Sequence, residues 1–434
     1  MSICQTPALP AGRSPRLLFV HSGSIKKRLT FEAAARMGVR IFLLNPTPNW
    51  AAEYAERTLY TKGLSLARTV AAVQELHEEV HLDGVVTFWE EDVPTTALLA
   101  SRLHLPGNRL TAAFNARSKY RMRLALQRAG VPVPPFSIVD GPESLPQAAA
   151  VSGFPAIIKP EWGSDSEWVA RVDSLEHAAA VHAEVRRRVR VQDCIYPYRG
   201  RRFVMEGLLT GPEVSVEGVV QQGRVTIYAI IDKAAMDQSS FIERGERTPS
   251  RLPEQTQTAI RQMVVDGVKA LGLTNSGIHA EVKVTPEGPR IVEIGARMGG
   301  DCIHALVLRV YGTDLAAESI RVALGQPASA AAAPRGCALS TTLVPEQPGR
   351  VHVEPRLPLR RSPHLIEVVL TKQNGDLVAV PPDGYDNLAW ISVWGRTHAE
   401  AQRRLEQRTA RLGSGLRVEP IPQHDVGHRT TAVA

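Results

Sequence analysis

The chain has 434 residues, of which 51 are Lys or Arg and 44 are Asp or Glu, so its formal net charge is +7. Hydrophobic residues make up 44% and charged residues 22%, which excludes disordered and collagen-like classes and predicts a globular protein of roughly two to four domains. No apolar run approaches the roughly 18 residues that cross a bilayer, so no membrane partner is expected. Residues 1–15 lack the apolar core of a secretory signal, which predicts a cytoplasmic protein.

The basic charge is concentrated in one segment. Residues 186–202 hold seven arginines and one aspartate, a net charge of +6, and the rest of the chain contributes only +1. A nucleic-acid-binding domain usually shows a broad basic face or a known module, and the sequence has neither. We therefore expect no nucleic-acid partner. The segment is interpreted as a local insert, either a solvated loop or a border to phosphates or an acidic substrate.

Strands and helices alternate in the first part of the chain, after residues 1–14, which are predicted to be disordered. Strands are expected over residues 16–20, 39–44 and 84–88, and helices over residues 26–37, 64–79 and 93–103. This alternation predicts an α/β layer with a parallel, doubly wound sheet. No G-x-G-x-x-G follows the first strand, so the dinucleotide-binding fingerprint is absent.

The middle of the chain is predicted to be α+β. Helices are expected over residues 115–129, 175–188, 253–271, 303–308 and 315–324, hairpins over 154–172 and 279–294, and strands over 203–208, 213–220 and 225–231. Residues 232–250 are interpreted as a mobile loop on the substrate side, with a plain surface loop as the alternative. The run Ala328–Ala333 resembles a linker, and a small β-rich module with a helix over 399–412 follows it.

The hairpin over residues 279–294 carries the sharpest chemical signal. Alternation places His279, Glu281 and Lys283 on one face. A turn centred on Glu287 would place Glu281 directly opposite Glu293, and like charges so placed destabilise a sheet. A hard divalent cation such as Mg²⁺ between the carboxylates would explain the pairing. Two edge glutamates on a solvated face are the alternative.

The residues after this hairpin favour the cation hypothesis. Arg297 lies four residues beyond Glu293, and the turn Gly299-Gly300-Asp301 follows at once. An arginine at this position can reach a phosphate or a developing oxyanion.

Two further segments are compatible with nucleotide binding. Lys159 ends a strand before the small-residue loop 163–166, which can offer one positive charge and several backbone N–H groups to phosphates. It is not a Walker A loop, because no G-K-[ST] precedes a helix, and a solvated strand-end lysine is the alternative. Residues 203–217 combine an apolar strand with Glu206 and Glu213, which could supply an adenine slot and a ribose acceptor.

In this order, the motifs resemble those of the ATP-grasp superfamily: Lys119, Lys159 with its loop, Glu206-x-x-Leu209, Glu213, Glu281 and Glu293-x-x-x-Arg297. The segment HAEVK…GPRIVEIGARMGGD is most similar to the sequences of one branch, that of L-amino acid ligases and carnosine-synthase-type enzymes. The resemblance covers roughly residues 16–420. It implies a Rossmann-like pre-ATP-grasp domain (15–110), a two-part ATP-grasp domain (111–208 and 209–330), a C-terminal α+β module (331–420) and a flexible tail (421–434).

The resemblance also implies a role for each matched residue. The ATP-binding set would be Lys119, Lys159, Ser164, Ser166, Glu206, Gly207, Leu208, Leu209, Glu213 and His279. Within it the two lysines would contact phosphates, the main chain at 206–209 adenine, and Glu213 ribose. Glu281 and Glu293 would hold Mg²⁺, with Mn²⁺ as the alternative. Arg297 and Lys159 would be catalytic, and Arg297, Gly299, Gly300 and Glu90 would bind the substrates.

Two positions depart from the family pattern. Many relatives have Asn two residues after the second metal-binding glutamate, where this chain has Gly295, so the number of metal ions stays open. The phosphate loop reads GSDSEWV, where the family often has a serine followed by Gly-Val, and Trp168 there leaves the loop's behaviour open.

The resemblance implies an ATP-dependent carboxylate–amine ligase that forms an amide through an acyl phosphate and takes small carboxylate and amine substrates, with a homodimer as one open assembly. A carboxylase activating bicarbonate and a nucleotide-binding protein without ligase activity are the alternatives. His77-Glu78-Glu79-Val80-His81 also matches the H-E-x-x-H zinc-peptidase pattern. A polar helix end is the preferred interpretation, because Leu82-Asp83-Gly84 stops the helix at once.

Overall fold

The computed structural model describes residues 13–164, 166–188, 195, 202–234, 244–355, 362–380, 384 and 386–421. Residues 1–12 of the predicted disordered N-terminus (1–14), residues 422–434 of the predicted flexible tail (421–434) and most of the Arg-rich segment therefore lie outside the described residues. Arg13 is described, and its guanidinium pairs with the carboxylate of Asp83 at 2.6 Å.

The N-terminal part is the predicted parallel sheet, with strand order β3-β2-β1-β4. Its strands are β1 (Arg16–Val20), β2 (Arg40–Asn45), β3 (Ala55–Tyr60) and β4 (Gly84–Val86). Its helices are η1 (Ile25–Lys27), α1 (Arg28–Arg36), η2 (Trp50–Tyr54), α2 (Leu66–Val80), η3 (Glu90–Asp92) and α3 (Val93–Arg102). The sequence did not predict β3, because this edge strand, AERTLY, is mostly polar and lacks a buried run.

The H-E-x-x-H segment does not form a continuous helical face. Helix α2 ends at Val80, and His81 adopts a left-handed conformation with φ of 51°. His81 therefore leaves the helical path on which two histidines four residues apart would share a face.

A break between two helices replaces the single helix predicted over 115–129. Helix α4 covers Leu110–Arg117 and helix α5 covers Lys119–Arg128. Ser118 between them is extended, and its hydroxyl accepts a hydrogen bond from the Arg121 N–H at 3.1 Å, which caps α5. The break presents Arg117 and Lys119 from two helix ends at one place.

A four-stranded antiparallel sheet of order β5-β8-β6-β7 follows. Its strands are β5 (Phe136–Val139), β6 (Ala156–Pro160), β7 (Ala170–Val172) and β8 (Phe203–Gly207), and it is accompanied by η4 (Pro142–Ser144), α6 (Leu145–Ser152) and α7 (Leu175–Arg188). The predicted hairpin over 154–172 is confirmed by the antiparallel pairing of β6 with β7. Strand β5 was missed because only Val139 of its four residues is buried.

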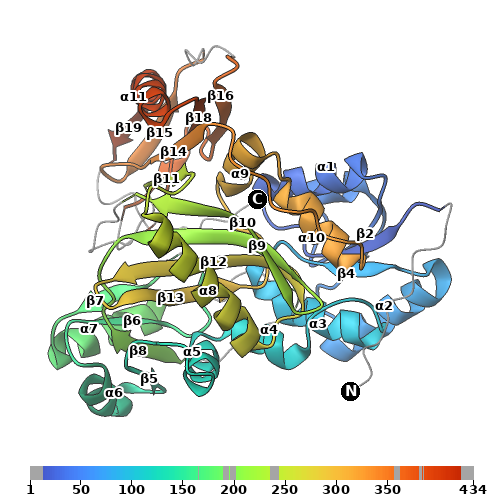
Figure 1. Ribbon diagram of the computed structural model, residues 1–434, viewed down its shortest axis with the longest axis horizontal. Helices are drawn as coiled ribbons and strands as arrows, with labels where there is room; N and C mark the ends of the chain where they lie inside the picture. Colours follow the sequence, from blue (N-terminus) through green and yellow to red (C-terminus); the bar gives the residue numbers. More distant parts are fainter. Residues whose placement is uncertain are drawn as a thin grey trace.

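The largest sheet has eight strands in the order β13-β12-β9-β10-β11-β14-β18-β16. The strands are β9 (Glu213–Gln221), β10 (Arg224–Lys233), β11 (Gly245–Thr248), β12 (Asn275–Thr285), β13 (Gly288–Gly295), β14 (Cys337–Leu343), β16 (Leu365–Leu370) and β18 (Ala389–Gly395). Part of the predicted mobile loop is therefore strand β11, and residues 235–243 lie outside the described part. Because β11 pairs with β14, the C-terminal module extends this sheet across the predicted linker (Figure 1).

Alternation along β9 and β12 gives this sheet one apolar and one polar face. Val214, Val216, Ala280 and Val282 pack in a core cluster with helix α8 (Glu254–Leu271). Residues of the opposite parity, including Glu217 and Glu281, therefore point away from α8. Helices α9 (Ile303–Tyr311) and α10 (Leu315–Ala323) belong to a second core cluster that includes Val219. The candidate site lies on this polar face.

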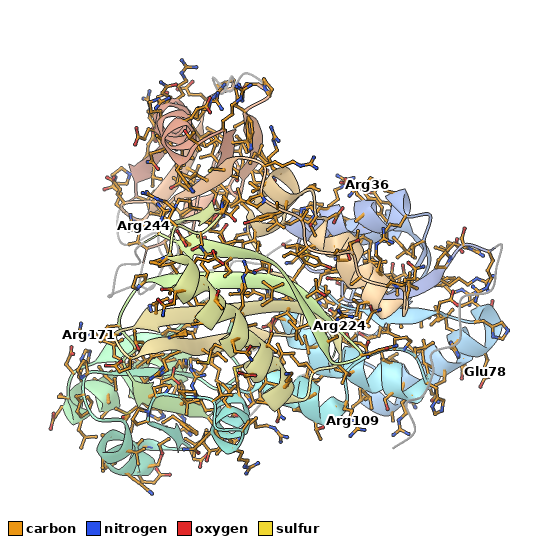
Figure 2. All side chains as sticks on the ribbon, viewed as in Figure 1. Arg36, Glu78, Arg109, Arg171, Arg224 and Arg244 are labelled. Carbon is orange, nitrogen blue, oxygen red and sulfur yellow. The ribbon has the colours of Figure 1, made fainter. Side chains whose placement is uncertain are left out.

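The remaining C-terminal elements are the small sheet β17-β15-β19 and helix α11 (His398–Ser414). The strands are β15 (Gly349–Val353), β17 (Leu377–Val378) and β19 (Leu416–Pro420). Among the described residues, no helix is both long and apolar enough to span a bilayer. Arginines such as Arg36, Arg171 and Arg224 project from separate parts of the molecule (Figure 2).

Candidate active site

The hairpin β12–β13 places Glu281 directly opposite Glu293, as predicted. The route to this pairing differs from the expected one. The turn has only two residues, Pro286 and Glu287, and a bulge at Val292 then shifts the register by one. The carbonyl group of Val292 is not lost to the fold, because it accepts a hydrogen bond from Arg123 at 2.9 Å.

Each glutamate of this pair is neutralised by a lysine from another element. Glu281 Oε1 lies 2.6 Å from Lys233 Nζ, and Glu293 Oε2 lies 3.0 Å from Lys119 Nζ. Burial raises the pKa of Glu281, but Lys233 and His279 outweigh burial and hold the pKa well below its usual range. Each carboxylate is thus balanced by the positive charge of a lysine. A divalent ion bound between them would balance both carboxylates in the same way.

A third carboxylate, that of Glu217 on strand β9, supports this pair. Glu217, which is 0% exposed, lies 2.5 Å from Nδ1 of His279 and accepts a hydrogen bond from the N–H of Gly299 at 2.9 Å. The other ring nitrogen of His279 lies 3.6 Å from Glu281. Burial disfavours the charged imidazole, but Glu217 raises the pKa of His279 to about 9. Glu217 was missed, although its alternation with Glu213 along β9 was a usable signal.

Lys159 and Glu206 form a buried charge cluster with Arg123. Glu206 pairs with Lys159 and with Nε of Arg123 at 2.8 Å. Burial would raise the pKa of Glu206, but Arg123 and Lys159 lower it to about 2. Burial lowers the pKa of Lys159, which Glu206 opposes. Arg123 was also missed, because its position inside an arginine-rich helix gave no separate signal.

The predicted adenine segment has few free backbone donors. Glu206 lies inside strand β8, which pairs on both sides. The N–H groups of Gly207 and Leu208 are bonded to the carbonyls of Pro135 and Pro155. These two N–H groups are therefore already used in hydrogen bonds of the fold. Among the described residues, the N–H of Leu209 is the one backbone donor of this segment that makes no backbone hydrogen bond.

Glu213, the predicted ribose acceptor, lies between two lysines. Its Oε1 is 3.1 Å from Lys233 Nζ, and its Oε2 is 2.9 Å from Lys283 Nζ. Lys233 therefore joins Glu213 to Glu281. The sequence placed Lys233 in a mobile loop, whereas it ends strand β10 with its amine buried between these carboxylates.

The predicted phosphate loop is docked against the N-terminal part of the chain. Lys119 Nζ donates to the carbonyl of Gly163 at 2.7 Å, and the hydroxyl of Ser164 donates to Glu91 at 3.0 Å. Ser166 is exposed and left-handed, with φ of 55°. Trp168 packs against the apolar core of the four-stranded sheet, so it anchors the far end of the loop. Asp165 lies outside the described residues.

Arg297 reaches across to the acids that follow strand β4. Its Nε donates to Oε2 of Glu90 at 2.6 Å, and its NH1 donates to the carbonyl of Met298. Gly295 makes this approach possible, because a Cβ added there would lie 3.0 Å from Oε2 of Glu90. An asparagine at position 295 would thus compete with Glu90 for space. Gly300, by contrast, has open space around its Cα.

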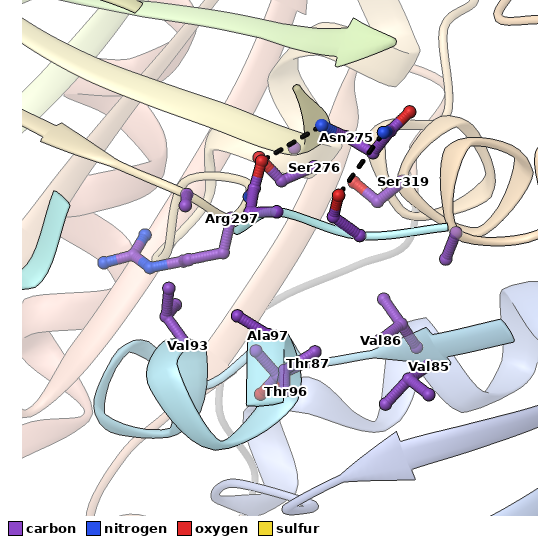
Figure 3. A pocket seen from close by; sticks show the side chains of 15 residues that line it. Val85, Val86, Thr87, Val93, Thr96, Ala97, Asn275, Ser276, Arg297 and Ser319 are labelled. Atoms are coloured by element: carbon purple, nitrogen blue, oxygen red, sulfur yellow. Dashed lines mark hydrogen bonds between the residues drawn. The ribbon is translucent and has the colours of Figure 1, made fainter. Parts of the chain in front are cut away.

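A pocket adjoins the backbone of Arg297 between the N-terminal sheet and the large sheet. Val85, Val86 and Ala97 line one side, and Ser276 and Ser319 line the other. The side chain of Arg297 extends away from the Val85–Val86 end of this pocket (Figure 3).

Taken together, the residues described above place opposed carboxylates, lysines and an arginine in one site, a set suited to binding a polyphosphate and a divalent cation.

Comparison with known families agrees with this geometry. Residues 31–107 match the ATP-grasp N-terminal domain, residues 152–305 the ATP-grasp domain, and residues 341–414 the L-amino acid ligase C-terminal domain 2. The fold and these matches show that the chain contains both ATP-grasp domains, which defines the class of its fold.

Within that class the chain is similar to amino acid ligases. It is 28% identical to carnosine synthase 1 of Gallus gallus over 72% of this chain and 35% of the relative. It is 28% identical to alanine–anticapsin ligase of Bacillus subtilis over 54% of this chain and 52% of the relative. The chain thus spans about a third to half of the length of these relatives. The structure of L-amino acid ligase from Bacillus licheniformis superposes with a TM-score of 0.77 at 22% identity, covering 94% of this chain and 100% of that one.

Proposed function

We propose that the protein is an ATP-dependent carboxylate–amine ligase that releases ADP and phosphate and joins amino acids or short peptides. The observation that carries the proposal is the opposed pair Glu281 and Glu293, with Arg297 four residues after Glu293. The sheet that holds this pair continues into the region that matches an L-amino acid ligase C-terminal domain. The names of the relatives, carnosine synthase and alanine–anticapsin ligase, support the same chemistry.

In the proposed reaction, the γ-phosphoryl group of ATP passes to a substrate carboxylate and gives an acyl phosphate. Lys119 and Lys159 balance the phosphate charges, and Arg297 holds the acyl phosphate for attack by the amine. Attack forms the amide and expels phosphate. Docking of the 161–168 loop keeps water from the acyl phosphate, which would otherwise hydrolyse.

Glu281 and Glu293 are the residues that would hold Mg²⁺, because both offer hard carboxylate oxygens on one face. A bound Mg²⁺ would neutralise charge on the transferring phosphoryl group. In the structure Lys233 and Lys119 pair with these carboxylates, so they supply the positive charge there. With Mg²⁺ and ATP bound, their ammonium groups would turn toward phosphate oxygens. Leu209 and Glu213 would meet adenine and ribose.

The proposal is tested by measuring ADP release over pairs of amino acids in the presence of Mg²⁺, with amide formation followed by mass spectrometry. We expect ADP and amide in equal amounts for at least one pair. Release that depends on bicarbonate and ignores amino acids would instead assign a carboxylase. ATP binding without turnover over every pair would assign a nucleotide-binding protein.

Glu293→Ala tests the metal assignment. We expect loss of turnover by about 100-fold or more, because one of two metal-binding carboxylates is removed. Mg²⁺ binding measured by calorimetry with a non-hydrolysable ATP analogue should weaken in parallel. Glu287→Ala, in the exposed turn of the same hairpin, should leave both unchanged. Full turnover in Glu293→Ala would make the metal assignment wrong.

A further inference from the structure

Arg117 is a buried arginine that sequence reasoning did not single out. It ends helix α4 at the break before Ser118, and its side chain is 2% exposed. Its guanidinium lies 3.3 Å from Oε1 of Glu90 and 3.5 Å from Oε1 of Glu91. It also donates to the carbonyl of Trp162 at 3.2 Å. A single side chain thus touches the acids after β4 and the phosphate loop.

The partners of Arg117 lead to two separate parts of the site. Glu90 accepts a hydrogen bond from Nε of Arg297 at 2.6 Å, so Arg117 and Arg297 hold the same carboxylate. Glu91 accepts a hydrogen bond from Ser164 at 3.0 Å, so Arg117 and the loop also share a carboxylate. Arg117 therefore connects the 161–168 loop with Arg297 through Glu90 and Glu91.

The charges of this cluster balance only while Arg117 is present. Two carboxylates, Glu90 and Glu91, face two guanidinium groups, Arg117 and Arg297, and all four are largely buried. Burial raises the pKa of Glu90, but Arg297 and Arg117 outweigh burial and hold it below its usual range. Without Arg117, Glu91 would lose its guanidinium partner and Glu90 would keep only Arg297 and the charge of Lys119, so Arg297 would be drawn toward the carboxylates and away from a phosphate.

We propose that Arg117 is a positioning residue that couples docking of the 161–168 loop to the orientation of Arg297. When the loop is docked, Trp162 and Ser164 fix Arg117 and Glu91, and Arg117 then holds Glu90 against one edge of Arg297. This holds Arg297 in the orientation from which its guanidinium would contact the acyl phosphate. The inference rests on the proposed function for its catalytic meaning, although the coupling itself is a property of the free protein.

The first test is hydrogen exchange on the full chain without substrate, which does not depend on ligase activity. In Arg117→Met we expect amide exchange to become about tenfold faster both in residues 161–168 and in residues 296–301, because the loop loses the bond from Arg117 to Trp162 and Arg297 loses the group that fixes its partner Glu90. Ser164→Ala should speed exchange most in the loop and less in residues 296–301, because its effect reaches Arg297 only through Glu91 and Arg117. Arg109→Met, an exposed residue at the outer end of the same helix (Figure 2), should change neither segment.

The second test uses turnover with a productive substrate pair. Arg117→Met should lower kcat more than it raises KM and should release several ADP per amide, because an undocked loop admits water to the acyl phosphate. Arg117→Lys should restore part of the coupling, since lysine can still pair with one carboxylate. A general loss of stability would lower both products together and leave their ratio near one.

Two results would overturn the inference. The first is a folded Arg117→Met whose exchange in residues 296–301 equals that of the parent protein. The second is an unchanged ratio of ADP to amide. If Arg117→Met fails to fold, Arg117→Lys and Glu91→Gln provide the same measurements. If no substrate pair gives turnover, the proposed function fails, while the exchange experiment still decides the coupling.

Discussion

Buried carboxylates of this protein are stabilised in two different ways. Glu206 has two cationic partners, Arg123 and Lys159, which lower its pKa to about 2 in spite of burial. Asp92 accepts hydrogen bonds from the N–H of Ile195 and the hydroxyl of Thr95, and the charge of His21 lowers its pKa by less than burial raises it. Burial therefore raises the pKa of Asp92 to about 6. The two acids should respond in opposite ways to pH.

Glu206→Gln should destabilise the fold. The substitution leaves Arg123 and Lys159 buried without their shared counter-charge, at a cost of roughly 3 kcal/mol, softened if Lys159 loses its proton. Urea unfolding at pH 7 measures this loss. Because the folded pKa is depressed, the contribution of Glu206 is full above its ordinary pKa of 4.5 and is lost as the pH falls toward 2. Glu287→Gln is the matched control, and an equal effect there would contradict the argument.

Asp92→Asn should remove a pH dependence. Because the folded pKa of Asp92 is raised from 3.8 to about 6, the folded state holds the proton more tightly. Its stabilisation is complete below pH 3.8 and is lost as the pH rises through 6, by at most about 3 kcal/mol. The variant should therefore gain stability relative to the parent between pH 5 and pH 7.5 in urea unfolding. A difference that stays constant with pH would show that Asp92 does not titrate in this range.

At the scale of elements, the sequence predicted what alternation controls. The strands of the parallel sheet and the two hairpins follow from buried runs and period-two patterns, and the facing of Glu281 and Glu293 follows from the hairpin. The compensation of a two-residue turn by a bulge at Val292 was not predictable, because the carbonyl of Val292 takes its hydrogen bond from Arg123, which donates from a helix far away in the sequence. Edge strands β3 and β5 were missed because β3 has no buried residue and β5 has only one, Val139.

Much of the candidate site was predictable only as isolated positions. The motif order located Lys119, Lys159, Glu213 and Arg297, but not their partners, which come from far along the chain. Arg117 and Glu217 were missed because a buried ion pair has no periodic signature. The Ser118 break was missed because the helix predicted over 115–129 runs through it, whereas the break is fixed by contacts with Glu161, which accepts from the Ser118 hydroxyl and, through its carbonyl, from the N–H of Lys119.

Ser118→Ala should reveal the value of this break. The change removes the cap of α5 and one donor to the fully buried Glu161, which keeps Arg202 as a partner. We expect a loss of about 1–3 kcal/mol in the free energy of unfolding. Ser65→Ala removes an exposed cap from α2 and should cost about 1 kcal/mol or less. Equal losses in the two variants would mean that the Ser118–Glu161 bond contributes nothing.

At the scale of the molecule, one sheet joins the ATP-grasp part to the C-terminal module. Strand β14 pairs with β11 from Gly245↔Thr341 to Thr248↔Ala338, and β18 and β16 continue the sheet. Ala338 and Trp390 also belong to the same core cluster as Tyr228 and Ile231. The run Ala328–Ala333 therefore connects two parts that share both hydrogen bonds and a core, which composition alone did not indicate.

A chain cut after Pro334 should consequently fail to fold alone. Strand β11 would still pair with β10, but its other edge would lose β14 and be left without a partner. The apolar side chains that Ala338 and Trp390 cover would be exposed to water. We expect residues 1–334 to collect in the insoluble fraction and residues 335–434 to do the same. Co-expression of the two fragments should restore a soluble complex, because the missing pairing is then supplied in trans. A soluble 1–334 fragment with cooperative unfolding would show instead that the two parts are independent domains.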